Sequence, residues 1–137
     1  MSGRYPVLVL GGTGVFGSRI CRRLARDRGL RVFVGGRSLT KAARLAREIG
    51  EAAPGSDVRP CAVTLPDGLT CALEETGVRI VIHTCGPFQG QDTSVAETCI
   101  GKGVHYLDLA DDRAFAAEFH RLDRAARENG VLAVSGV

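Results

Sequence analysis

The fold is decided by one stretch near the N-terminus, Val7-Leu8-Val9-Leu10-Gly11-Gly12-Thr13-Gly14-Val15-Phe16-Gly17. Its first four residues are apolar and stop abruptly at glycine, which is the pattern of a short strand buried on both faces. Apolar residues at helical spacing then follow from Ile20 to Ala25, until Gly29 ends them. The stretch therefore predicts a strand, a tight turn and a helix in immediate succession.

The glycines of this turn form the pattern Gly12-x-Gly14-x-x-Gly17, overlapped by a second pattern that starts at Gly11. An early glycine allows the tight turn out of the strand, and Gly14 lacks the Cβ atom that would hold a pyrophosphate away from the backbone. Gly17 lets the helix pack closely against the strand. The start of that helix offers unpaired N–H groups and the positive end of its dipole. The loop predicts a dinucleotide site, and the absence of a Gly-Lys-Ser/Thr ending argues against a triphosphate-binding loop.

A second apolar strand, residues 32–34, ends in Gly35-Gly36-Arg37-Ser38, and Arg37 stands twenty residues after Gly17. An acidic residue at about this spacing would bind the ribose 2′-hydroxyl of NAD. Arginine instead offers a fork of donors to the 2′-phosphate of NADP, and Ser38 could add a hydroxyl. The alternative is an exposed arginine at the start of the next helix, for which Thr40 is the expected N-cap. We predict NADP as the cofactor, with NAD disfavoured.

The rest of the chain alternates between short apolar runs and helical stripes. Strands are expected over 7–10, 32–34, 58–63, 78–83, 104–109 and 131–134, and helical stripes over 20–25, 42–49, 69–75, 93–101 and 115–126. Gly29, Gly50 and Gly130 are the expected ends of the first, second and last of these helices. This alternation predicts an α/β fold, a Rossmann-type doubly wound parallel sheet of about six strands with helices on both faces. Ligands of such sheets bind beyond the C-terminal ends of the strands.

Length and composition narrow the class of protein. The chain has 137 residues, the size of one domain, with 45% hydrophobic and 24% charged residues. A formal net charge of +3 gives no reason to expect nucleic acid, and no apolar run approaches the ~20 residues that span a membrane. Five cysteines without a Cys-x-x-Cys pair suggest neither disulfides nor a metal site. We expect a cytoplasmic location.

Two later strand ends carry further candidate residues. Thr84, Cys85, Gly86 and Pro87 follow the fourth strand and should lie beside the nicotinamide-side ribose, with Cys85 as a packing residue rather than a nucleophile. His83 is interpreted as a core histidine. Asp108, at the end of the fifth strand, fits a structural hydrogen bond and a catalytic role equally well, and Asp111 and Asp112 suit a helix N-terminus. No residue is identified as the catalytic acid or base.

Four segments together resemble the N-terminal NAD(P)-binding domain of the saccharopine dehydrogenase-like oxidoreductases, and the resemblance covers essentially the whole chain. They are Val7 to Gly17, Gly36-Arg37-Ser38, Thr84-Cys85-Gly86-Pro87-Phe88 and Gly103-Val104-His105-Tyr106-Leu107-Asp108-Leu109. The resemblance implies cofactor contacts at Gly11, Gly12, Thr13, Gly14, Val15, Phe16, Arg37, Ser38, Thr84 and Gly86. In relatives an acidic residue often stands near the end of the third strand, where this chain has none before Asp67.

The resemblance also implies a function. Family members are NAD(P)-dependent oxidoreductases, often acting at a carbon–nitrogen bond, and continue into a substrate-binding domain. We therefore expect residues 1–137 to be the cofactor domain of a longer enzyme, inactive alone, whose small-molecule substrate binds through the missing domain. A complete short-chain reductase is disfavoured because Tyr106 is followed four residues later by Ala110, not by lysine. The alternative function is a non-catalytic NADP sensor acting through a partner, and a homodimer is left open.

Overall fold

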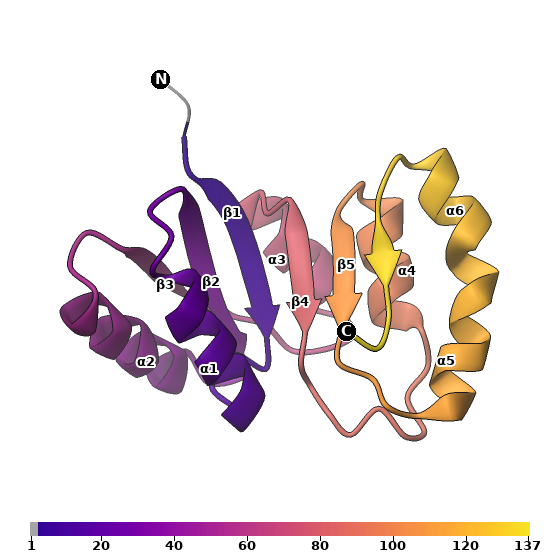
Figure 1. The fold of residues 1–137 in the computed structure, drawn as a ribbon, viewed down its shortest axis with the longest axis horizontal. Coiled ribbons are helices and arrows are strands. Elements are labelled where there is room, and N and C mark those ends of the chain that lie inside the picture. Colours follow the sequence, from indigo (N-terminus) through magenta and orange to yellow (C-terminus); the bar gives the residue numbers. More distant parts are fainter. Residues whose placement is uncertain (1–2) are drawn as a thin grey trace.

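The computed structural model describes residues 3–137, which form one six-stranded sheet with helices against it (Figure 1). The strands are β1 (Tyr5–Leu10), β2 (Leu30–Gly36), β3 (Asp57–Ala62), β4 (Ile80–His83), β5 (His105–Asp108) and β6 (Ala133–Val134). The helices are α1 (Val15–Leu24), α2 (Leu39–Ala52), α3 (Leu69–Thr76), α4 (Ser94–Gly101), α5 (Arg113–Phe119) and α6 (Asp123–Glu128), with a 3₁₀ turn at His120–Leu122 between the last two.

All neighbouring strands pair in parallel, in the order β3-β2-β1-β4-β5-β6. The chain first moves outward from β1 to β3 and then returns to the centre and moves outward the other way. Because each crossover is right-handed, the two halves place their helices on opposite faces. In Figure 1, α1 and α2 lie in front of β1–β3, whereas α3 and α4 lie behind the sheet.

The core has one layer on each face of the sheet. On the front face, Val9, Val32 and Val34 pack against apolar residues of α1 and α2, including Cys21 and Leu45. On the back face, a larger cluster joins strand residues to α3, α4 and α6; its members include Leu8, Val81, Tyr106, Leu73, Ile100 and Ala126. Successive residues of β1 point to opposite layers, so the apolar run 7–10 is buried on both faces as predicted.

The predicted fold class is confirmed, with differences at the ends of elements. The expected final helix is divided into α5, the 3₁₀ turn and α6. The 3₁₀ turn keeps Phe119 and Leu122, three residues apart, on one side of the chain. Strand β6 is also shorter than expected. Among the described residues, no helix has the length and apolar character needed to cross a membrane.

Candidate functional site

A cavity of about 430 Å³ opens beyond the C-terminal ends of the central strands. Its walls come from the glycine loop after β1, the end of β2, the segment after β3 and the loop after β4. The lining residues are Leu10, Gly11, Thr13, Gly14, Gly36, Arg37, Val63, Leu65, Thr84, Cys85 and Gly86. Segments far apart in the sequence thus meet at the edge of the sheet where ligands of this fold class bind.

The glycine loop leaves backbone donors free at this edge. Gly11 has a φ of +74°, which turns the chain sharply after β1, and the Gly14 N–H donates to the Gly11 carbonyl over 3.0 Å. Helix α1 then begins at Val15, capped by Gly14 without any side-chain cap. Within residues 3–137, the N–H groups of residues 15–17 have no backbone acceptor. Such unpaired N–H groups at a helix start fit the oxygens of a phosphate.

Gly14 and Gly17 have different roles in the structure. A Cβ atom on Gly14 would meet only the Gly11 carbonyl oxygen, at 3.3 Å, so the residue faces open space at the cavity. A Cβ atom on Gly17 would lie 2.0 Å from that same oxygen and 2.9 Å from Cα of Gly12. Gly17 is therefore required for the contact between helix α1 and the glycine loop itself, rather than with the strand as predicted.

Arg37 provides the cavity with a positive charge. It follows the end of β2, is exposed, and forms no ion pair with any residue that the structure describes. Its neighbour Ser38 is the N-cap of α2, where Oγ accepts a hydrogen bond from the Lys41 N–H over 3.2 Å. The expected N-cap at Thr40 is therefore wrong. The Ser38 oxygen is engaged with α2, whereas the Arg37 guanidinium is available to an anion.

The loop after β4 is tied to the glycine loop. The Thr84 hydroxyl donates to the Leu10 carbonyl over 2.7 Å, and its backbone N–H donates to the same oxygen over 3.0 Å. Cys85 is half-buried, and this burial raises the pKa of its thiol although Arg37 lowers it in part. A neutral thiol at neutral pH agrees with the predicted packing role of Cys85.

A second cavity, of about 520 Å³, adjoins the first and shares Thr84 and Gly86 with it. It is lined in addition by Phe16, Pro87, Phe88, Leu109, Asp111 and Val137. Of the predicted cofactor residues, Phe16 and Pro87 lie here rather than in the first cavity. Gly12, Val15, Gly17 and Ser38 line neither cavity. The lining residues that the sequence did not predict are Leu10, Val63, Leu65, Phe88, Leu109, Asp111 and Val137. The position of Leu109 directly after β5 could have indicated it, whereas nothing local marks Val137.

The structure favours a structural role for Asp108, which is fully buried at the end of β5. Its Oδ2 accepts a hydrogen bond from the Tyr106 hydroxyl over 2.6 Å. Its Oδ1 accepts from the Ser135 hydroxyl and from the N–H groups of Gly136 and Ala110, over 2.8, 2.9 and 3.0 Å. Both carboxylate oxygens are thus occupied, and Oδ1 holds the segment after β6 through Ser135 and Gly136.

His83 is a core histidine, as interpreted from the sequence: it is 2% exposed and packs edge-on against Phe88. Burial lowers its pKa, and the nearby Asp108 carboxylate raises it only in part. Because the pKa in the folded state lies below the unfolded value of about 6.5, its contribution to stability is present above that pH. The contribution is lost as the pH falls further, through the pKa of the folded state.

We therefore expect the free energy of unfolding to fall between pH 7.5 and pH 5.5, and to fall less in His83→Asn. Urea denaturation at several pH values measures both slopes. His120→Asn, at an exposed position, is the matched control and should keep the wild-type slope. An unchanged slope in His83→Asn would show that another group titrates.

The strand order of the parallel sheet reverses beside β1, and the glycine loop opens into a cavity at that point. These two features define a dinucleotide-binding domain of the Rossmann type. The model of the saccharopine dehydrogenase NADP-binding domain family matches residues 7–134. The chain belongs to this family, as its sequence motifs predicted, and NADP is its cofactor. Among curated proteins, none matches the chain.

Solved structures confirm the fold. A short-chain dehydrogenase from Sphingobium yanoikuyae in complex with NADPH superposes with a TM-score of 0.63, at 19% identity, over 96% of this chain and 70% of that one. A metagenomic short-chain oxidoreductase in complex with NADP gives a TM-score of 0.62 at 19% identity, over 97% of this chain and 81% of that one. A β-ketoacyl-[ACP] reductase from Bacteroides thetaiotaomicron gives 0.69 at 14% identity, over 96% and 79%.

Proposed function

We propose that this chain is the cofactor domain of a saccharopine dehydrogenase-like oxidoreductase, which holds NADP for hydride transfer to or from a small-molecule substrate. The observation that carries the proposal is the first cavity, where Gly11, Thr13 and Gly14 of the glycine loop share one space with Arg37. The free N–H groups of residues 15–17 follow directly after Gly14. The glycine loop suits the pyrophosphate of NADP, and Arg37 suits its 2′-phosphate. The nicotinamide, when bound, supplies the hydride chemistry.

Each residue of the site has a proposed task. The loop from Gly11 to Gly17 would hold the pyrophosphate, with Gly14 as the point of closest approach. Arg37 would bind the 2′-phosphate, with Ser38 beside it. Thr84, Cys85, Gly86 and Pro87 would border the nicotinamide-side ribose. These tasks fit the two adjoining cavities, since Thr84 and Gly86 line both.

The proposal extends to the substrate and to the setting of the domain. The resemblance of this chain to amino-acid dehydrogenases supports a reaction at a carbon–nitrogen bond of an amino-acid-like substrate. A separate C-terminal domain would hold that substrate. Five free cysteines are compatible with a reducing cytoplasm. Asp108 is fully engaged in structural hydrogen bonds, so the catalytic acid or base is proposed to lie in the substrate domain.

If the substrate domain is required, the isolated chain should bind NADP and show no turnover. Mixing it with NADP and saccharopine, or with related amino acids, should produce no NADPH absorbance above the rate without protein. Steady NADPH production by the purified chain would contradict a separate substrate domain.

The cofactor assignment is tested at Arg37. A hydrogen bond to a charged group contributes roughly 1.5–3 kcal/mol, and we take the low end because the side chain is exposed. Since 1.4 kcal/mol is tenfold in affinity, Arg37→Ala should weaken NADP binding about tenfold and change NAD binding little. Arg37→Asp should reverse the preference, because a carboxylate repels the phosphate and accepts a hydrogen bond from a hydroxyl. Calorimetric titration with both nucleotides measures these changes.

Arg47→Ala is the control for loss of a positive charge, because Arg47 is exposed on α2 and does not line the cavity. It should leave both affinities nearly unchanged. Raising the salt concentration should reduce the difference between wild type and Arg37→Ala. Equal weakening of NADP and NAD by Arg37→Ala would show that Arg37 does not bind the 2′-phosphate.

A further inference from the structure

Charge is unevenly distributed along this chain. Residues 1–62 contain 12 Lys and Arg against 4 Asp and Glu, a formal charge of +8, whereas residues 63–137 contain 6 against 11, a formal charge of −5. The division falls between β3 and α3. The net charge of +3 is therefore the sum of two strongly charged halves. The positive half is built from β1–β3 with α1 and α2, and the negative half from β4–β6 with the other helices.

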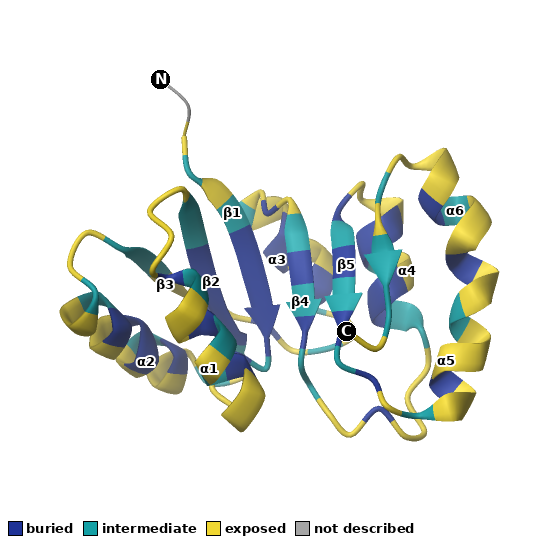
Figure 2. Ribbon diagram, viewed as in Figure 1, coloured by how far each residue is buried: buried dark blue, intermediate teal, exposed yellow. Residues whose placement is uncertain are grey.

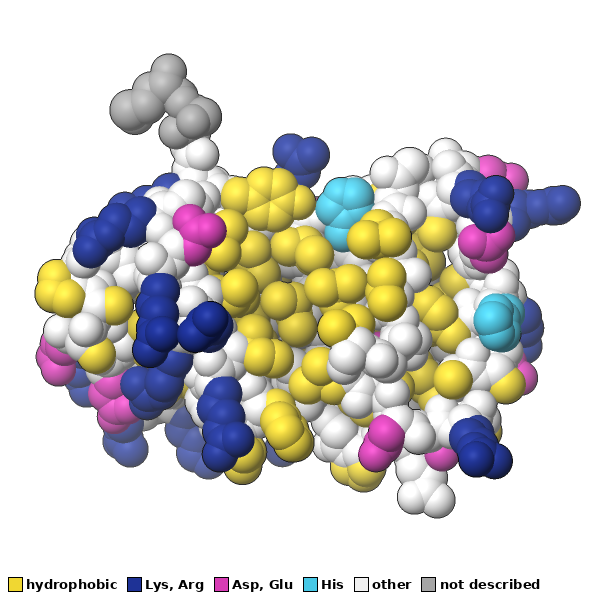
Figure 3. Space-filling model, in the orientation of Figure 1, with side chains coloured by type: hydrophobic (Ala, Val, Ile, Leu, Met, Phe, Trp, Pro, Cys, Tyr) yellow, Lys and Arg dark blue, Asp and Glu magenta, His cyan; other side chains and the backbone are white. Residues whose placement is uncertain are grey.

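Half of the 12 basic residues of the positive half lie on α1 and α2, whose outward surfaces are exposed (Figure 2). Figure 3 shows Lys and Arg side chains gathered over these two helices. The exposed basic residues of α1 and α2 are Arg19, Arg22, Arg23, Lys41, Arg44 and Arg47. Within residues 3–137, only Arg22 among them forms an ion pair, with Glu48. The other acid of α2, Glu51, lies near the C-terminal end of that helix.

Both helices begin beside the first cavity. Helix α1 begins at Val15, directly after Gly14. Helix α2 begins at Leu39, two residues after Arg37. Gly14 and Arg37 both line the cavity. The N-terminal ends of α1 and α2 therefore lie at the place where we propose that the phosphates of NADP bind.

Three of these basic residues lie in the first turns of the two helices. Arg19 lies about 6 Å along the axis of α1 from the first residue of that helix. Lys41 and Arg44 lie about 3 and about 7.5 Å along α2 from its first residue. Charges are screened over about 8 Å at physiological ionic strength. An anion that approaches the cavity therefore comes within range of all three charges, although none of the three residues lines the cavity.

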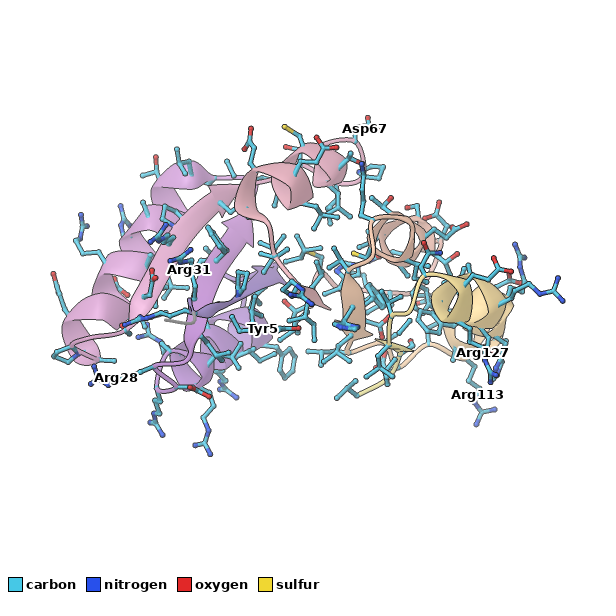
Figure 4. The ribbon with its side chains drawn as sticks, turned by 90° about the horizontal axis from the view of Figure 1, so that it is seen from above. Tyr5, Arg28, Arg31, Asp67, Arg113 and Arg127 are labelled. Carbon is cyan, nitrogen blue, oxygen red and sulfur yellow. The ribbon has the colours of Figure 1, made fainter. Side chains whose placement is uncertain are left out.

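The carboxylates near the site lie on its other sides. Of the described residues that line the first cavity, only Arg37 is charged. Asp67, two residues after the lining residue Leu65, lies beside α3 on the back of the sheet (Figure 4). Asp92 lies in the loop after β4, and Asp111 lines the second cavity, on the side proposed for the nicotinamide. The positive charges thus stand on the phosphate side of the proposed site, whereas these carboxylates stand behind the sheet or toward the nicotinamide.

We propose that Arg19, Lys41 and Arg44 steer NADP into the first cavity and favour NADP over NAD by the rate of association. This inference rests on the proposed function, because it takes that cavity as the cofactor site. A charged surface beside a cavity concentrates ligands of the opposite charge there and raises their association rate by about 10- to 1,000-fold. NADP carries a 2′-phosphate that NAD lacks, so the same field attracts NADP more strongly.

The three steering residues and Arg37 contribute to the selection of NADP in different ways. Charges that make no contact with the bound ligand change its association rate and the dependence of that rate on salt. A residue that contacts the ligand, as proposed for Arg37, mainly changes the dissociation rate. We therefore expect kinetic measurements to separate the two contributions, although both affect the affinity.

Stopped-flow mixing with NADPH and with NADH, followed by the fluorescence of the reduced nicotinamide, tests the proposal. In the variant Arg19→Gln/Lys41→Gln/Arg44→Gln, the association rate constant of NADPH should fall about tenfold at about 0.1 M salt, and that of NADH about threefold. The dissociation rate constants should change less than about twofold. At about 1 M salt, where charges are screened over about 3 Å, the variant and the wild type should bind NADPH equally fast.

The variant Arg121→Gln/Arg124→Gln/Arg127→Gln is the matched control, because it removes three exposed positive charges from the 3₁₀ turn and α6. Arg127 points outward at the end of the molecule away from α2 (Figure 4). The control lowers the net charge equally and should change NADPH association less than about twofold at about 0.1 M salt. Equal slowing by the two triple variants would overturn the proposal, since net charge rather than position would then matter. So would faster dissociation as the main effect of the first variant, which would indicate direct contact with the cofactor.

The wild-type protein provides a second test that needs no variant. Its association rate constant for NADPH should fall about tenfold between about 0.1 and 1 M salt, and more steeply than that for NADH. Equal salt dependence for the two nucleotides would overturn the steering while leaving the proposed function intact. Calorimetric titration of the wild type with NADPH tests the proposed function itself, and an absence of binding would overturn both.

Discussion

Gly17→Ala is expected to destabilise the fold by about 3 kcal/mol or more, near the upper end of the usual range for overpacking. The added methyl group would lie 2.0 Å from the Gly11 carbonyl oxygen and 2.7 Å from its carbon. Both atoms belong to backbone held between β1 and α1, so no side chain can rotate to make space. The loop and the helix would have to separate, which disturbs the cavity as well. Urea denaturation followed by circular dichroism measures the loss.

Gly50→Ala is the matched control, since Gly50 lies within α2 and a Cβ atom there would meet nothing within 4 Å. This substitution should stabilise the protein by about 0.5–1 kcal/mol, because glycine is unfavourable inside a helix. The same Gly→Ala substitution is thus expected to lower the free energy of unfolding at Gly17 and to raise it at Gly50. A Gly17→Ala protein as stable as wild type would mean that the loop lies farther from α1 than described.

Gly14→Val should leave the fold largely intact and weaken NADP binding by about a hundredfold. Gly14 is extended, with φ −76° and ψ 179°, a conformation that β-branched residues adopt readily. A branched side chain would occupy the space where a phosphate must approach the N–H groups of the loop. Losing two hydrogen bonds to a charged group at about 1.5 kcal/mol each removes about 3 kcal/mol, which is roughly a hundredfold in affinity.

Calorimetry gives the affinity of Gly14→Val for NADP, and its thermal unfolding curve shows whether the fold persists. Gly14→Ala, which adds one methyl group near the Gly11 carbonyl, should fall between wild type and the valine variant. Unchanged NADP affinity in a folded Gly14→Val protein would show that the pyrophosphate binds elsewhere.

The sequence could predict the features that depend on residues close together in the chain. The strand, glycine loop and helix follow one another directly, so the fold class and the positions of Gly14 and Arg37 beside a cavity could be deduced from their spacing. Contacts between distant residues could not. Thr84 reaches Leu10, 74 residues away, only because β4 pairs with β1. The local periodicity of the sequence does not determine the strand order.

The other differences between prediction and structure arise where the sequence is compatible with more than one local structure or where distant residues meet. Ser38 and Thr40 both suit a helix N-cap. The backbone after β2 starts α2 at Leu39, which makes Ser38 rather than Thr40 the N-cap. The break between α5 and α6 is invisible in an apolar stripe that a continuous helix would satisfy equally well. Val137 lines the second cavity because the chain after β6 turns back toward β5, where the Val137 N–H donates to the Asp108 carbonyl over 3.0 Å. This contact joins residues 29 positions apart, so no local pattern indicates it.

The attachment of Ser135 and Gly136 to Asp108 makes the fold dependent on the segment directly after β6. Ser135 and Gly136 supply two of the four donors that satisfy this buried carboxylate. A polypeptide still being synthesised, with these residues inside the ribosome, would have to bury a half-solvated negative charge to complete β5. The C-terminal half of the sheet should therefore close only after Gly136 has emerged.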